Sequence, residues 1–381
     1  MYKYLTFLLL LIPSLGFSQE KLGFQQSDSL TYQYYLKGEW KNLIGLSKTA
    51  FHQNIDSKFM RQRAGYAYLM TGDYTAAEIQ FLKALEFDRA DEFTQTNLYY
   101  AALNRGSENR RHYAGYLSQE AKYKLGIQQI NPVSLFDTEF NLKANSSDSR
   151  SNQVYYRFGL GTELGYRLTI YQAVAFFKQT VSSVSTRQPE YVAMLNYTLS
   201  PKWQFKGTYH FLNTNDGYTA YPGNLGLLAI TRQLNRFNLE ANGSILKSTF
   251  ATTRQFGLKA GVVFPGRSNI YLTSALTGIS EDGASRVIYS QGAGLKCTKN
   301  LWAEGYITIG NLKNYNTFNG LYIYNSVDPS IFRTGCTLSY FLGKHLALTG
   351  NFTFDQQQIE STSGNSYYYQ YSYSGGIKWR L

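Results

Sequence analysis

Apolar and polar residues alternate through the last two thirds of the chain, and this two-residue period constrains the fold more than any other feature. Between residues 135 and 381 it runs through about fourteen segments of roughly 10 to 15 residues, each bounded by turn-forming residues. The last segment places four tyrosines, Ile377 and Trp379 on one face, and Gln370 and Ser372 on the other. One face suits lipid and the other suits water, which predicts an antiparallel transmembrane β-barrel.

The composition agrees with a barrel that crosses a membrane. Aromatic residues make up 16% of the chain, including 34 tyrosines, and charged residues also make up only 16%. Aromatic residues are enriched where barrels cross the membrane interfaces. The net charge of +12 suits contact with the phosphates of lipopolysaccharide. We therefore expect outer-membrane lipid and lipopolysaccharide as partners, and no nucleic acid.

A soluble sandwich or propeller is the alternative for residues 131–381. Its strands would send their aromatic residues inward and carry charge outside, whereas here the apolar face carries almost no charge. In hydrocarbon an open sheet edge leaves unsatisfied backbone groups, so a membrane sheet has to close. We predict 14 strands; 12 or 16 stay open, because the aromatic loop from Asn311 to Ser330 could add a hairpin.

The predicted connections alternate in length, as in outer-membrane barrels with short periplasmic turns and long outer loops. Short turns are expected near Pro201, Asn235 and Pro265, and long polar loops from Asn213 and Asn311. An even strand number then places both ends of the barrel on the periplasmic side. The aromatic-rich final strand resembles the terminal strand that such barrels present to their insertion machinery.

Residues 1–18 have one lysine, a short apolar run and small residues before Gln19, which predicts a cleaved secretory signal peptide. Residues 19–130 carry the second periodic pattern. Gly38, Gly72 and Gly106 follow one another at steps of 34 residues between helical-looking segments. The clearest unit, around Gly72, has small, aromatic and turn residues at regular offsets: Gly65, Tyr68, Tyr74, Ala77, Phe81, Ala84 and Leu85.

This pattern resembles the tetratricopeptide repeat, a helix-turn-helix unit that stacks on its neighbours. The first unit is a degenerate copy, and residues 107–125 are interpreted as a terminal capping helix. Tyr32, Tyr66 and Tyr100 recur at the same step, at an offset that faces the concave groove of tetratricopeptide arrays. The resemblance implies a periplasmic protein or peptide partner bound through these tyrosines; the alternative is packing between repeats.

Charged residues on the water-suited face of the strands decide what the barrel interior can do. We place more basic than acidic residues there, and the site residues predicted to line the lumen are Arg157, Lys178, Lys206, Glu240, Lys259, Lys296, Glu304, Arg333 and Lys378. One interpretation is an aqueous pathway that favours anions. The other is an interior sealed by salt bridges and aromatic residues.

Nothing in the sequence indicates catalysis. The four histidines, His52, His112, His210 and His345, show no metal-ligand spacing and no paired nucleophile. We expect no catalytic residue, metal or cofactor, and hence no enzyme. Cys297 and Cys336 fall on lipid-facing positions of strands separated by one intervening strand, beyond disulfide reach, which predicts buried free thiols.

The whole arrangement predicts an α+β multidomain protein: a signal peptide, a tetratricopeptide-like helical domain in the periplasm (residues 19–130) and an outer-membrane barrel (residues 131–381). It resembles repeat-barrel outer-membrane proteins of Bacteroidota-type Gram-negative bacteria, with the YaiO-like outer-membrane barrel group as the nearest family. The leading hypothesis is a scaffold whose repeats recruit a partner in envelope assembly, secretion or export. A porin-like channel with a basic lumen for anionic or small polar solutes is the alternative, and a lipid-modifying barrel enzyme is the third.

Overall fold

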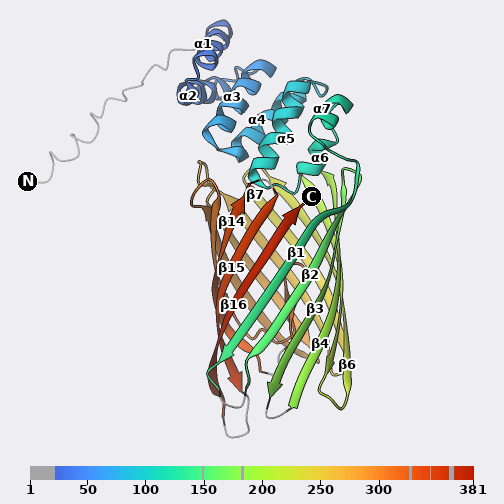
Figure 1. Ribbon diagram of the computed structural model, residues 1–381. Coiled ribbons are helices and arrows are strands. Elements are labelled where there is room, and N and C mark those ends of the chain that lie inside the picture. The colour runs from blue at the N-terminus through green and yellow to red at the C-terminus, as the bar shows by residue number, and fades with distance from the viewer. Residues whose placement is uncertain (1–21, 148–149, 182–183, 326–327, 344, 360–363) are drawn as a thin grey trace, which may run out of the picture.

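The computed structural model describes residues 22–147, 150–181, 184–325, 328–343, 345–359 and 364–381; the predicted signal peptide lies outside them. Fourteen antiparallel strands close into one barrel, in which β1 pairs with β16 (Figure 1). The predicted strand number of 14 is confirmed. The wall strands are β1 (Ile130–Asn145), β2 (Gln153–Leu164), β3 (Leu168–Val181), β4 (Val184–Ser200), β5 (Trp203–Asn215), β6 (Ala220–Leu234), β7 (Phe237–Ser248), β8 (Thr252–Val263), β9 (Tyr271–Glu281), β10 (Ala284–Lys296), β11 (Leu301–Ile309), β14 (Ser330–Leu342), β15 (Leu346–Ile359) and β16 (Ser366–Arg380).

The segment between β11 and β14 does form a hairpin, but the hairpin is not part of the wall. Strands β12 (Tyr315–Thr317) and β13 (Tyr322–Tyr324) pair only with each other in a separate two-stranded sheet. Their side chains contact the inner faces of several wall strands, so the described residues of this segment, 310–325 and 328–329, cross the lumen. We call it the inner hairpin.

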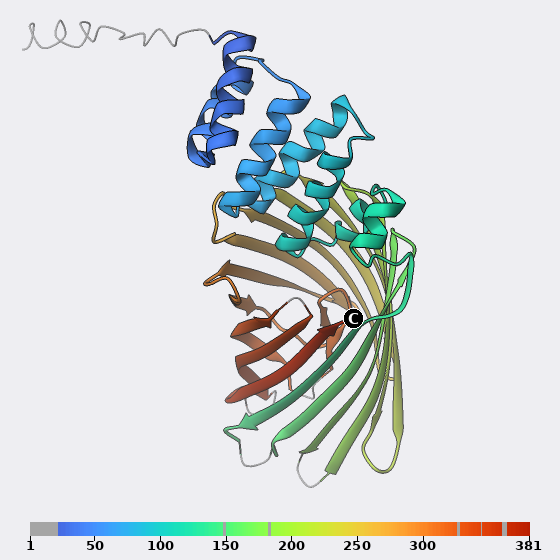
Figure 2. The same cartoon turned by 45° about the horizontal axis from the view of Figure 1, so that its top comes forward.

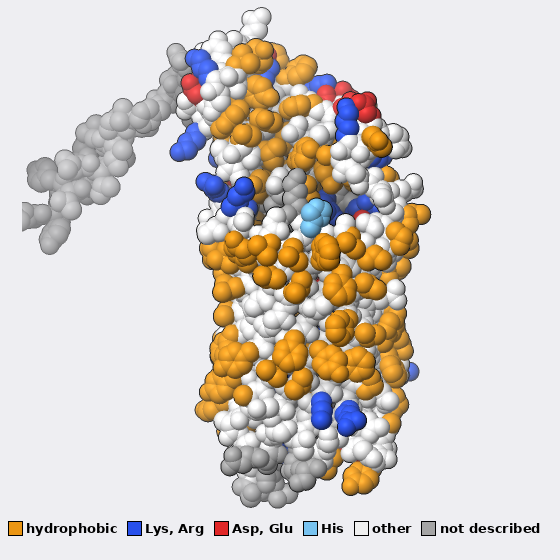
Figure 3. All heavy atoms as spheres, in the orientation of Figure 1, with side chains coloured by type: hydrophobic (Ala, Val, Ile, Leu, Met, Phe, Trp, Pro, Cys, Tyr) orange, Lys and Arg blue, Asp and Glu red, His pale blue; other side chains and the backbone are white. Residues whose placement is uncertain are grey.

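The outer surface of the barrel is apolar. Tyr367, Tyr373 and Trp379 on β16 are between 51% and 56% exposed, whereas Gln370 and Ser372 on the same strand are buried inside. Exposed leucine, phenylalanine and tyrosine side chains repeat on the other wall strands, and Figure 3 shows them gathered mainly in two bands around the visible face. The alternation predicted from sequence is thus the division between the outside and the lumen.

The connections agree with the prediction at one end of the barrel only. Short turns join β4 to β5, β6 to β7 and β10 to β11 at the end that faces the helices (Figure 1). At the other end the strands run further than expected: β5 reaches Asn215 and β6 begins at Ala220, so the predicted long loop from Asn213 is mostly strand. Among the described parts of the connections, only the one between β11 and β14, with residues 310–325 and 328–329, is long.

Seven helices precede the barrel in the described part of the chain: α1 (Phe24–Lys37), α2 (Trp40–His52), α3 (Lys58–Thr71), α4 (Tyr74–Phe87), α5 (Glu92–Arg105), α6 (Arg110–Ala114) and α7 (Gln119–Lys124). Gly38, Gly72 and Gly106 end α1, α3 and α5 in the left-handed conformation, with φ of 68°, 83° and 73°, which a glycine adopts without steric cost. The 34-residue step of the sequence is thus a repeat of helix pairs. Where one capping helix was expected at residues 107–125, two short helices are present.

Close packing explains the small residue at position 65. A β-carbon on Gly65 would lie 2.8 Å from the ring of Phe81, which is fully buried between α3, α4 and α5. Glycine therefore lets α4 approach α3. None of the helices in the described residues is long and apolar enough to cross a membrane.

The helical domain lies on the turns at one end of the barrel (Figures 1 and 2). Asp73, the N-cap of α4, accepts a hydrogen bond from the Gly266 amide at 3.2 Å and pairs with Arg236 at 3.0 Å. Further along the rim, the Asn109 amide donates to the Pro201 carbonyl at 2.9 Å. Direct polar contacts thus fix the helices to successive barrel turns.

The last rim contact is the most highly charged. Arg110 and Arg111 of α6 pair with Glu163 at the end of β2, at 3.3 and 3.2 Å. Arg111 is 9% exposed, and burial lowers its pKa. Its neighbour His112 is 4% exposed, and burial lowers the pKa of that imidazole to about 4. The buried contact therefore holds His112 neutral and keeps Arg111 against a carboxylate.

Candidate functional site in the barrel lumen

A cavity of about 720 Å³ lies inside the barrel, between the wall and the inner hairpin. Strand alternation turns the polar face of each strand into it, so serine, threonine, asparagine, glutamine and charged side chains make up most of its lining. The hairpin contributes aromatic rings, among them Tyr315, Tyr322 and Tyr324. The lumen is therefore polar and partly filled by the chain itself.

Tyr322 anchors one side of the inner hairpin. The Arg157 guanidinium of β2 donates to the Tyr322 hydroxyl at 2.8 Å, and that hydroxyl donates to Glu139 of β1 at 2.5 Å. Arg157 also pairs with Asp137 and Glu139, both at 3.1 Å, and all three charged side chains are largely buried. A buried, charge-assisted network of this kind is costly to break, because each lost partner leaves a charge unpaired.

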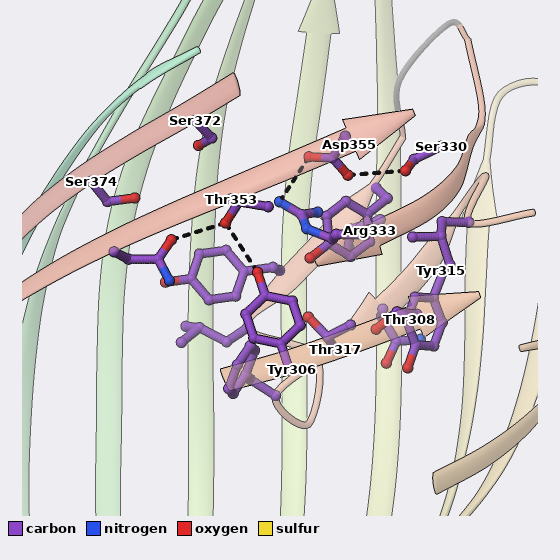
Figure 4. A pocket seen from close by; sticks show the side chains of 18 of the residues that line it. Tyr306, Thr308, Tyr315, Thr317, Ser330, Arg333, Thr353, Asp355, Ser372 and Ser374 are labelled. Atoms are coloured by element: carbon purple, nitrogen blue, oxygen red, sulfur yellow. Dashed lines mark hydrogen bonds and ion pairs between the residues drawn. The ribbon is translucent and has the colours of Figure 1, made fainter. Parts of the chain in front are cut away.

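Arg333 anchors a second side of the inner hairpin. Its guanidinium pairs with Asp355 at 3.5 Å and lies 4.5 Å from the ring centre of Tyr324. Figure 4 shows Arg333 pointing at Asp355, which also accepts a hydrogen bond from Ser330 at 2.9 Å. The cation–π contact and the ion pair together tie β13 to β14 and β15.

The opposite wall receives the turn of the hairpin. His210 of β5, which is fully buried, contacts the Gly320 carbonyl through Nδ1 at 2.8 Å, and Thr208 donates to the Asn319 carbonyl at 2.7 Å. Gly320 has a φ of 87°, and a β-carbon there would lie 2.9 Å from Leu225. The turn therefore requires a left-handed residue without a side chain at this position.

The charge of the cavity differs from the prediction. Nine basic and five acidic residues were expected on the lumen face, whereas the cavity is lined by six basic residues (Lys143, Arg150, Arg157, Lys259, Arg333 and Lys378) and seven acidic ones (Asp137, Glu139, Glu190, Glu240, Glu304, Asp328 and Asp355). The lining of this cavity is therefore not predominantly basic. The three arginines are in ion pairs, at 2.8, 3.1 and 3.5 Å, whereas the three lysines make no ion pair with a described residue.

The predicted lumen residues fall into three groups. Arg157, Glu240, Lys259, Glu304, Arg333 and Lys378 line the cavity. Lys206 and Lys296 lie at the rim, where Lys206 pairs with Glu108 of the helical domain at 3.5 Å and Lys296 lies 5.5 Å from the Tyr74 ring. Lys178 does not face the lumen: it shares the outward face of β3 with Val174 and Phe176, while Ala173 and Ala175 are buried inside.

The three predicted partner-binding tyrosines do not share one environment. Tyr32 is 49% exposed, with the Arg63 guanidinium 5.1 Å from its ring centre. Tyr66 lies among three other aromatic rings, with centroid distances of 5.4, 5.7 and 6.2 Å, and Tyr100 lies edge-on to Tyr99 at 5.9 Å. Tyr100 also packs against the buried cluster that contains Ala114 and Leu117. Tyr66 and Tyr100 therefore contribute to packing between helices, and Tyr32 is the most accessible of the three.

The tyrosines of the inner hairpin were not among the site residues predicted from the sequence. The signal was present in "LYIYNS", whose alternation matches that of a wall strand but whose length, three residues in β13, is far short of a span. Strands that cross a bilayer need about 9 to 11 residues. The short alternating segment should therefore have been separated from the wall.

The histidines and cysteines show no arrangement for chemistry. His210 Nε2 lies 3.3 Å from Glu190, but its ring is enclosed by the inner hairpin, and His345 lies in an exposed turn. Within the described residues no group of three potential metal ligands was found. Cys297 and Cys336 are free thiols, as predicted, but both are exposed and not buried.

The fold and the lumen define a closed antiparallel barrel with an apolar outer surface, a polar interior and an N-terminal helical domain. No family model and no curated protein matches the sequence. Solved structures with a similar barrel include the Pseudomonas putida toluene transporter TodX (9% identity, 74% of this chain and 94% of that chain, TM-score 0.46), Omp33 of Acinetobacter baumannii (10%, 67% and 100%, 0.37) and the translocator domain of the autotransporter NalP from Neisseria meningitidis (12%, 69% and 94%, 0.36). At these TM-scores the likeness carries no argument about function.

Proposed function

We propose that this protein is an outer-membrane channel for small polar solutes, narrowed by the inner hairpin. The observation that carries the proposal is the polar cavity of about 720 Å³ inside a closed barrel, with an internal segment tied across it by ion pairs and hydrogen bonds. A barrel of about fourteen strands is wide enough for a solute path but would be unselective if empty. The inner hairpin narrows the solute path through the barrel.

The location follows from the outer surface. Exposed apolar side chains on nearly every strand are unfavourable in water and favourable in lipid, and closure satisfies all wall hydrogen bonds. We assign the end with the short turns, both barrel termini and the helical domain to the periplasm, because outer-membrane barrels turn tightly on that side.

Single-channel conductance in a planar bilayer tests the proposal. The full chain should give small, steady openings, and replacing residues 312–327 with a short Gly-Ser turn should increase them severalfold. Lys259→Glu should move the ion selectivity towards cations, because this lysine lines the cavity without an ion partner among the described residues. The outward-facing Lys178→Glu is its matched control. Silence from both the full chain and the shortened variant would contradict a channel.

A second function is supported by the surface of the helices, and it retains the tetratricopeptide resemblance. Exposed apolar residues recur at the 34-residue step on α1, α3 and α5: Leu36 matches Met70, and Phe59 matches Phe93, with exposures between 41% and 65%. We propose that this face binds a periplasmic protein or peptide, which would make the barrel its anchor.

Site-specific photocrosslinking in cells tests that proposal. A photoreactive residue at Met70 should capture a protein, whereas the same residue at Phe87, which is 54% exposed on α4 outside the repeated set, should not. Equal capture from both positions, or none from either, would count against a binding face. The channel proposal does not depend on this result.

A further inference from the structure

One part of the cavity wall carries a free positive charge among neutral hydrogen-bonding groups. Lys143 on β1 is flanked in register by Ser372 of β16 and Gln153 of β2. It lines the cavity and makes no ion pair with a described residue. Two residues back on β1, Asn141 lies beside Tyr155 of β2. These neighbours place an ammonium, two amides, a hydroxyl and a phenol on one patch.

The amides in this patch have unused hydrogen-bonding capacity. Asn141 donates to Ser372 at 2.7 Å and to Ser374 at 2.5 Å, while its buried Oδ1 has no partner among the described residues. Gln153 is 6% exposed and makes no side-chain hydrogen bond with a described residue. Buried polar groups are normally satisfied, and an exception calls for a partner outside the chain.

The patch differs from the surroundings of the other two free lysines. Lys259 lies across from Glu240 in the β7–β8 register, and Lys378 lies across from Asp137 in the β1–β16 register. Carboxylates therefore stand close to both, whereas the cross-strand neighbours of Lys143 are neutral. Arg333, Asp355, Glu139 and Glu190 act on Lys143 electrostatically from elsewhere on the cavity wall, but no carboxylate stands directly opposite it in either register. Its ammonium forms no ion pair with a described residue and can receive an anion.

Amide side chains donate and accept hydrogen bonds together, which matches the hydroxyl groups of a polyol. An ammonium pairs with a carboxylate. The rings of Tyr155 and Tyr322 lie 6.3 Å apart beside the patch and offer flat apolar faces. A ligand that uses all of these features has one carboxylate, several hydroxyl groups and a compact apolar ring.

We propose that this patch is a binding subsite for a hydroxylated monocarboxylate of the sugar-acid class. Lys143 holds the carboxylate, Gln153 and Asn141 hold hydroxyl groups, and the inner hairpin closes the site through Tyr322. The inference rests on the proposed channel function, of which it names the solute class. An inorganic anion could accept hydrogen bonds from the Lys143 ammonium and the Gln153 amide, but it has no ring to lie against Tyr155 and Tyr322.

Isothermal titration of the refolded full chain in detergent tests the subsite without requiring transport. D-glucuronate should bind at least about tenfold more tightly than glucose, which lacks the charge, propionate, which lacks the hydroxyl groups, or inorganic phosphate. Lys143→Gln should weaken glucuronate binding by about tenfold or more, and Lys143→Arg should restore part of it. The matched control is Lys178→Gln, on the outward face of β3, two strands away.

A second variant separates recognition from charge. Gln153→Leu should weaken glucuronate binding and leave propionate binding unchanged. Equal affinity for glucuronate and propionate, or glucuronate binding that survives Lys143→Gln in a folded barrel, would overturn the inference. Conductance without glucuronate binding would refute the subsite and leave the channel standing; glucuronate binding without conductance would refute the channel and keep the subsite.

Discussion

Asp73 is the residue whose loss should most directly loosen the helical domain from the barrel. Its carboxylate caps α4 by accepting the Ala76 amide at 3.1 Å, accepts the Gly266 amide at 3.2 Å, and pairs with Arg236 at 3.0 Å. Asp73 is 7% exposed. One side chain thus begins a helix and also fixes that helix to two barrel turns.

Arg236→Gln isolates the fixing role, because it leaves the cap and the Gly266 contact in place. The ion pair has side-chain exposures of 22% for Arg236 and 10% for Asp73. For a pair at this depth we expect a loss of about 1 to 2 kcal/mol. If the Gly266 amide exchanges with solvent when the domain lifts, its exchange should accelerate by about 5- to 30-fold. Asp73→Ala should add about 1 kcal/mol for the lost cap.

Hydrogen exchange followed by mass spectrometry on the Gly266 peptide measures this effect. The control is Arg232→Gln on the same rim, whose guanidinium lies 4.9 Å from the Trp203 ring and makes no ion pair with a described helix residue. Unchanged Gly266 exchange in Arg236→Gln would refute the reasoning. So would additive effects of Asp73→Ser and Arg236→Gln, because partners in one ion pair should couple.

Three further predictions concern single residues. Lowering the pH from 6.5 to about 4 should destabilise the helical domain by up to about 3 kcal/mol, because His112 accepts a proton more readily when unfolded; thermal melts should show the loss, and His112→Gln should flatten it. Gly65→Ala should cost about 1 to 2 kcal/mol despite better helix propensity, because its β-carbon meets Phe81; an unchanged denaturation midpoint would contradict this packing. Gly320→Ala should displace the inner hairpin and raise conductance, whereas Gly217→Ala, with a φ of 91° and open space around it, should not.

The barrel could be predicted because its information is local. Strand alternation needs only the neighbouring residues, and β16 shows it over its whole length, from exposed tyrosines to buried Gln370 and Ser372. The glycines that end α1, α3 and α5 are equally local signals, since a left-handed position favours glycine wherever the helix lies. Both predictions were correct because each depends only on residues that are close together in the sequence.

The lumen was harder to predict than the wall. It depends on which face of each strand turns inward and on the space left inside the closed barrel. Phe176 and Phe177 are adjacent, so both faces of β3 carry an aromatic ring, and the sequence does not show on which face Lys178 lies. The pairing of Arg333 with Asp355 could have been predicted from the sequence, because the tight turn after Leu342 sets the register that places the two residues opposite each other. The short length of β13 indicated that the inner hairpin is not part of the wall, but its position inside the lumen could not be predicted, because that position depends on the closed barrel.

The contacts between the helical domain and the barrel follow both the order of the helix pairs and the order of the barrel turns. The connection after α3 meets the turns at Arg236 and Gly266, and the connection after α5, one repeat later, meets the turn at Pro201. Two contacts that lie one helix pair apart on the helical domain therefore fall on different turns of the barrel edge. Inserting a further helix pair between α3 and α5 would carry the Asn109 contact away from the turn at Pro201 and leave the contacts of Asp73 in place.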